Sequence, residues 1–88
     1  YETVIRAIIE KQEETIGLIA RQRAKRIEVI EPDEDEVTFN SEPDKDDVEA
    51  LMEEYKEIQG QGAVGIARGA LSEIDVDVEI PEEIEPQE

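Results

Sequence analysis

The sequence contains no cysteine, no histidine and no tryptophan. Without cysteine the chain has neither disulfides nor thiolate metal ligands. Without histidine it lacks the side chain that proteins use most often as a general base and as a transition-metal ligand. A Ser–His or Cys–His nucleophile pair is therefore excluded within this chain. We predict a protein that is not an enzyme, with no catalytic residues, no metal site and no cofactor.

Long hydrophobic runs are also missing. No apolar stretch approaches the roughly 20 residues that a membrane helix needs. The first ten residues show an amphipathic helix pattern with charges inside it, which is unlike a signal peptide. We predict no membrane association and a cytoplasmic location.

Negative charge dominates what is present. The 88 residues include 26 Asp and Glu against 9 Lys and Arg, a net charge of −17. Self-repulsion at this density opposes a compact fold in dilute buffer, whereas about 1 M salt shortens the screening length to about 3 Å. Together with only four lysines, this balance predicts adaptation to high salt.

The charge is unevenly distributed along the chain. Residues 1–26 carry six basic and four acidic residues, a net of +2, whereas residues 27–88 carry three basic and twenty-two acidic residues, a net of −19. One near-neutral segment with a basic end therefore precedes a strongly acidic remainder.

Hydrophobic spacing predicts one small domain over residues 1–80. Apolar residues recur at helical spacing through residues 2–26, which predicts one long helix with Gln12 and Thr15 as polar interruptions of its apolar stripe. Residues 27–40 alternate around an acidic turn at 31–36 and predict a β-hairpin.

The second half of the chain begins with a helix signal. Asp44 is a candidate N-cap, and apolar residues from Val48 to Ile58 mark an amphipathic helix. A glycine-rich portion follows, so that either one helix covers residues 44–73 or two helices meet at residues 60–62. Strict alternation over 74–80 predicts a strand, and residues 81–88 have the composition of a disordered acidic tail.

These elements predict an α+β fold. It consists of a long N-terminal helix, a short hairpin, a second helix with a glycine-rich portion and a C-terminal strand. The alternative is an all-α helical bundle that forms a dimer, with the alternating segments extended but unpaired.

The glycine-rich portion has two interpretations. The segment Gly60-Gln61-Gly62-Ala63-Val64-Gly65 resembles the G-x-G-x-x-G fingerprint of dinucleotide-binding proteins, and Glu79 lies near the position of the ribose-binding acid, which implies a nucleotide-binding alternative. The fingerprint follows a strand, however, and here a predicted helix precedes it. The second interpretation is that Gly62, Gly65 and Gly69 let another backbone approach closely, within the monomer or across a dimer.

A basic cluster is the second candidate interaction site. It consists of Arg21, Arg23, Lys25 and Arg26. These cations can pair with the protein's own acids, dock an acidic partner protein or a second subunit, or grip phosphates. We predict no nucleic-acid binding, because the net charge repels polyanions and only three aromatic residues occur in the chain.

The acids gather in three groups, at 33–36, at 44–47 and in the row Asp75, Asp77 and Glu79. None matches a known calcium loop, and we interpret them as solvated surface. Small size, the isoleucine-rich first helix and the glycine-rich portion together predict a self-associating protein-interaction or regulatory module, most simply a homodimer.

Overall fold

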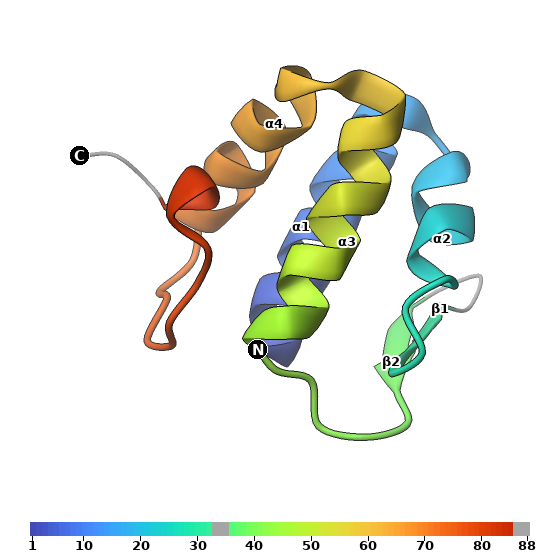
Figure 1. The fold of residues 1–88 in the computed structure, drawn as a ribbon, viewed down its shortest axis with the longest axis vertical. Coiled ribbons are helices and arrows are strands. Elements are labelled where there is room, and N and C mark those ends of the chain that lie inside the picture. Colours follow the sequence, from blue (N-terminus) through green and yellow to red (C-terminus); the bar gives the residue numbers. More distant parts are fainter. Residues whose placement is uncertain (33–35, 86–88) are drawn as a thin grey trace.

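The computed structural model describes residues 1–32 and 36–85. Within these ranges the chain forms four α-helices, one antiparallel hairpin and a short 3-10 helix (Figure 1). The fold is α+β, as predicted, and the hairpin rules out an all-α chain. No helix in the described ranges combines the length and the apolar composition needed to cross a membrane.

The N-terminal region contains two helices, α1 (Glu2–Ile16) and α2 (Ile19–Ala24). The prediction of one helix over residues 2–26 is therefore wrong. Gly17 has a φ of 73°, a left-handed conformation that residues other than glycine rarely adopt. The chain turns at this residue, and α2 packs against α3 (Lys45–Gln59) instead of extending α1 (Figure 1).

The predicted hairpin is confirmed. Strand β1 (Ile30–Pro32) pairs antiparallel with β2 (Val37–Phe39). The first strand begins three residues later than the alternation suggested, because Ile27 lies in the turn after α2, where it is buried. Residues 33–35 of the predicted acidic turn lie outside the described residues.

Helix α3 begins where the sequence predicts. The Asp44 carboxylate accepts a hydrogen bond from the Asp47 amide at 3.2 Å, and the Asp47 carboxylate accepts one from the Asp44 amide at 2.9 Å, which forms a capping box. Gly60, with a φ of 59°, then ends α3. The region therefore contains two helices, and the second, α4 (Gln61–Ser72), packs against α1 (Figure 1).

The predicted C-terminal strand over residues 74–80 is not formed. The segment is irregular, with bends at residues 74 and 78, and it pairs with no strand. The alternation is seen in the burial pattern: Ile74, Val76 and Val78 pack against the core, whereas the intervening acids are exposed. Such alternation requires only one buried face, and here the helical core instead of a sheet supplies the covering surface.

Residues 81–85 of the predicted tail are packed against the domain. They contain a 3-10 helix, η1 (Glu82–Ile84), and the Ile84 side chain is fully buried. Arg68 Nε donates to the Glu83 carbonyl at 2.7 Å, and Lys56 Nζ lies 2.5 Å from the Glu83 carboxylate. The packed part of the chain therefore extends beyond residue 80. Residues 86–88 lie outside the described residues.

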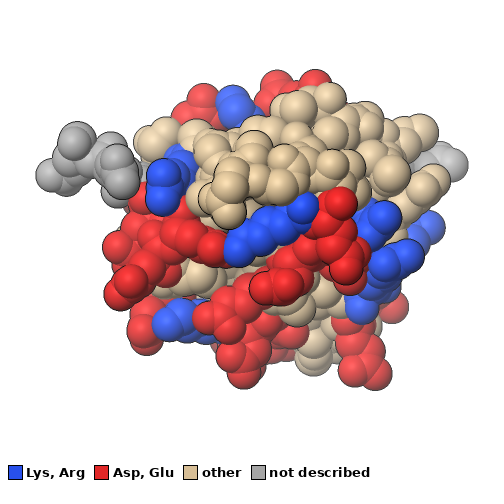
Figure 2. All heavy atoms as spheres, turned by 45° about the horizontal axis from the view of Figure 1, so that its top comes forward, with Lys and Arg blue, Asp and Glu red and all other residues tan. Residues whose placement is uncertain are grey.

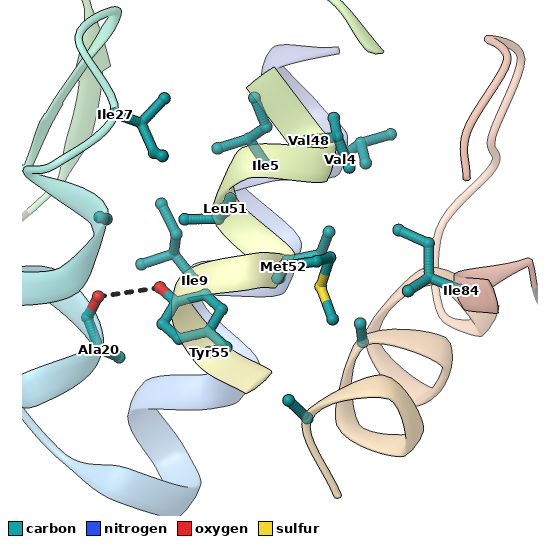
Figure 3. Close-up of a cluster of buried hydrophobic side chains, with 14 of the residues drawn as sticks. Val4, Ile5, Ile9, Ala20, Ile27, Val48, Leu51, Met52, Tyr55 and Ile84 are labelled. Carbon is teal, nitrogen blue, oxygen red and sulfur yellow. Dashed lines mark hydrogen bonds between the residues drawn. The ribbon is translucent and has the colours of Figure 1, made fainter. Parts of the chain in front are cut away.

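The core lies between the inward faces of α1, α3 and α4, and α2 and η1 close its two sides (Figure 3). Its largest fully buried apolar side chains are Ile5, Ile8 and Ile9 of α1, Leu51, Met52 and Tyr55 of α3, Leu71 of α4 and Ile84 of η1. Each of these helices presents apolar residues at three- and four-residue spacing toward the centre.

Candidate functional site

The basic cluster at the end of α2 contacts acids on α3. Arg23 Nη1 lies 2.9 Å from Glu57 Oε2 and 3.3 Å from Glu54 Oε1. Arg26 Nη1 lies 3.2 Å from the same Glu54 oxygen. Two of the predicted interaction residues thus hold α2 against α3 through one shared carboxylate.

The other two members of the cluster differ from each other. Arg21 is mostly buried and pairs with Glu13 of α1, whereas Lys25 is exposed. An acidic partner protein would have to compete with this chain's own carboxylates for the three arginines. Because such pairs are weak in concentrated salt, they position α2 without contributing much stability.

The glycine fingerprint lies at a junction between two helices. Gly60 ends α3, and the remaining residues of the motif form the first turns of α4. The dinucleotide fingerprint requires a strand before the first glycine, so that the phosphates reach a helix N-terminus at the edge of a sheet. The motif spacing is present here without that strand, and the geometry gives the nucleotide alternative no support.

The glycine face of α4 is open in the part of the monomer that the structure describes. Gly62, Gly65 and Gly69 occur at intervals of three and four residues, which places them along one face of the helix. A Cβ atom at Gly65 or Gly69 would meet no atom within 4 Å, and one at Gly62 would meet only the Gln59 Cβ at 3.9 Å. Close packing of another part of the monomer on these glycines, one form of the prediction, is not seen in the described residues.

The three glycines nevertheless make helix α4 less stable than alanines would. A glycine inside a helix is about 1 kcal/mol less favourable than alanine, because more backbone freedom is lost. Since the monomer leaves room for a larger residue at all three positions, packing within the chain does not account for them.

The acidic groups separate in space. Asp44 and Asp47 cap α3, and Asp75, Asp77 and Glu79 are exposed along the C-terminal segment. Residues 33–35, which belong to the remaining group at 33–36, lie outside the described ranges. In the part of the chain that the structure describes, no cluster of three or more acids has the geometry to hold a metal ion.

Two stretches without acids lie at one end of the molecule. Residues 15–27 and 58–72 contain no Asp or Glu, although the chain has 26 of them. The first stretch covers the α1–α2 turn and α2, and the second covers the α3–α4 turn and α4. Both turns lie at the same end of the bundle (Figure 1). We call the surface of these two stretches the acid-free end.

Buried hydrogen bonds anchor each stretch to a core helix. Gln12 is fully buried, donates from Nε2 to the Ala63 carbonyl at 3.1 Å and accepts from the Gln59 side chain. The Tyr55 hydroxyl donates to the Ala20 carbonyl at 2.8 Å. Burial raises the pKa of this phenol, so it remains a donor at neutral pH. The shape of the acid-free end is therefore fixed by the core.

The acid-free end exposes apolar side chains. Leu18 is 72% exposed and Ile19 is 38% exposed, and among the described residues these are the large hydrophobic side chains left in solvent. Ile58 and Ile66, in the second stretch, are half-buried. Figure 2 shows a broad patch without charged side chains, bordered by Lys and Arg as well as by Asp and Glu.

Sequence reasoning missed this surface. The prediction of one continuous helix over residues 2–26 hides the turn that exposes Leu18 and Ile19. The available signal was the length of the two acid-free stretches, which is unusual where 26 of 88 residues are acidic. In comparisons with known proteins, no family model, curated protein or solved structure matches the chain.

Proposed function

We propose that this protein is a non-catalytic interaction module that self-associates in concentrated salt. The observation that carries the proposal is the acid-free end, where Leu18 and Ile19 are exposed on a protein of net charge −17. Burying a leucine side chain contributes about 1.5–3 kcal/mol, so association that covers these residues is favourable.

The charge supports a saline working environment. Two molecules of net charge −17 repel one another at low ionic strength. Concentrated salt screens that repulsion and strengthens the association of apolar surfaces when the anion is kosmotropic. A cytoplasm rich in salt is the location that we propose, with a homodimer as the working form.

Light scattering tests the proposal directly. The molar mass of the protein is measured over micromolar concentrations in about 2 M KCl and again in dilute buffer. We expect twice the chain mass of 10.0 kDa in high salt and a shift toward the monomer as salt is removed. A monomer at every concentration in high salt would contradict the proposal.

A further inference from the structure

The acid-free end combines an exposed leucine and an open helix face. Leu18 lies in the α1–α2 turn and is 72% exposed. Gly65 and Gly69 leave the backbone of α4 uncovered, because nothing lies within 4 Å of where a side chain would begin. A branched apolar side chain can pack directly on such a backbone.

We infer that a second copy of this chain covers the acid-free end, with Leu18 of each copy against the glycine face of α4 in the other. This inference rests on the proposed self-association and names its surface. In a twofold-symmetric dimer the same patch serves both subunits, so the contact between Leu18 of one copy and the glycine face of the other forms twice.

The distribution of charge favours a second copy of this chain as the partner that covers the acid-free end. The outward face of α3 carries Glu49 and Glu53, and the C-terminal segment exposes Asp75, Asp77 and Glu79. A copy that approached either region would place carboxylates against carboxylates, which is unfavourable. The acid-free end is where two molecules of this charge meet with the least repulsion.

Other partners fit this end less well. A basic protein would bind the acidic rows, which lie elsewhere on the molecule (Figure 2). An acidic protein would seek cations, but Arg23 and Arg26 already pair with Glu54. Another acid-free end brings no carboxylates, and of its five cations the four arginines already bind groups of their own chain, so a second copy can approach there without repulsion between acids.

The available area is sufficient for a dimer. A standard interface buries about 600–800 Å² on each partner. The chain exposes 5295 Å² in total, so such an interface takes about 11–15% of its surface. Of the 28 residues in the two acid-free stretches, 20 are at least partly exposed, and one side of such an interface uses about 20–30 residues.

Two substitutions test Leu18 and the glycine face separately. Leu18→Glu places a charge at the exposed leucine, and Ala50→Glu adds the same charge to an exposed position on the outward face of α3. Gly65→Gln covers the glycine face without changing the net charge, and Ala50→Gln is its control. All four changes lie on the surface, and circular dichroism verifies that each variant folds.

Sedimentation equilibrium in about 2 M KCl is the measurement. We expect Leu18→Glu and Gly65→Gln each to raise the dimer dissociation constant at least about tenfold, while both Ala50 variants match the unmodified protein. A dimer unaffected by both acid-free-end substitutions would overturn the inferred surface and leave self-association standing. A monomeric unmodified protein would overturn both, and would indicate that a different molecule covers Leu18.

Discussion

Helices α3 and α4 are neighbours in the chain with similar inward faces and opposite outward ones. Both present apolar residues to the same core. Outward, the 15 residues of α3 include six acids, whereas the 12 residues of α4 include none and carry three glycines. Since one fold accommodates both, the fold does not require every outward helix face to be acidic. In our proposal the outward face reflects what surrounds each helix, which is salt water at α3 and another protein molecule at α4.

The difference also has an energetic side. Glu49, Glu53 and Glu57 follow one another at four-residue spacing on α3, and like charges at that spacing destabilise a helix by a few tenths of a kcal/mol per pair. Helix α4 avoids this repulsion but accepts the cost of its glycines. In our proposal, salt screens the repulsion between the acids of α3, and contacts with a second copy offset the cost of the glycines in α4.

The largest expected effect tests whether the two inward faces are equivalent. Leu51 on α3 and Leu71 on α4 are both fully buried. We expect Leu51→Ala and Leu71→Ala each to lower the free energy of unfolding by about 2–5 kcal/mol, because each leaves a cavity. Urea unfolding at constant salt measures this. A loss below about 1 kcal/mol for either would mean that its helix is not part of the common core.

Tyr55 sharpens the comparison, since it gives α3 a buried polar contact with α2. Tyr55→Phe removes the hydrogen bond to the Ala20 carbonyl, and we expect a loss of about 0.5–1.5 kcal/mol.

The same residue predicts a dependence on pH. Burial, aided by the charge of Glu13, raises the folded-state pKa of Tyr55 above its ordinary value of 10.0. The neutral phenol is therefore favoured in the folded state, and its contribution is complete below pH 10 and declines as the pH rises above that value. The unmodified protein should lose more stability than Tyr55→Phe above pH 10 in urea titrations. Parallel pH profiles would contradict this assignment.

Gly65→Ala separates the monomer from the dimer. In the monomer the added methyl group meets open space, so we expect a gain of about 0.5–1 kcal/mol from helix propensity alone. In the dimer the same methyl group lies at the interface, so the dissociation constant should rise. Unfolding at low protein concentration and sedimentation at high concentration report the two effects. A less stable monomer would show that the position is already occupied within the chain.

The smallest expected effect concerns the ion pairs between α2 and α3. Arg26 is 59% exposed on its side chain and pairs with Glu54 at 3.2 Å. In about 2 M KCl we expect Arg26→Gln to change the free energy of unfolding by less than about 0.5 kcal/mol. A loss well above that value would mean that the pair has a larger structural role than its exposure indicates.

Local signals made part of this fold predictable from the sequence. The N-cap at Asp44 and the hairpin alternation are short-range patterns, and both are found in the structure. The end of α1 at Gly17 was not predictable in the same way, because a single glycine can either lie within a continuous helix or end one. Contacts between α2 and α3, far apart in sequence, favour the second outcome here.

The remaining errors have a common cause. Alternation over residues 74–80 shows that one face is buried, but it does not say whether a sheet or a helix covers the other side. Likewise, the absence of acids in 15–27 and 58–72 can be read from the sequence, whereas their meeting at one end depends on contacts such as Gln12 with Ala63. Glycine spacing on α4 was visible, but only the structure shows that the monomer leaves that face open.

The central claim is that two copies meet at their acid-free ends, and the cysteine-free sequence allows a direct measurement. A single cysteine is introduced either at Gln61, which is exposed at the start of α4, or at Ala50 on the outward face of α3. Each variant is treated with a flexible bis-maleimide cross-linker in about 2 M KCl. We predict a covalent dimer from Gln61→Cys and almost none from Ala50→Cys. Equal yields, or a higher yield from Ala50→Cys, would contradict the account.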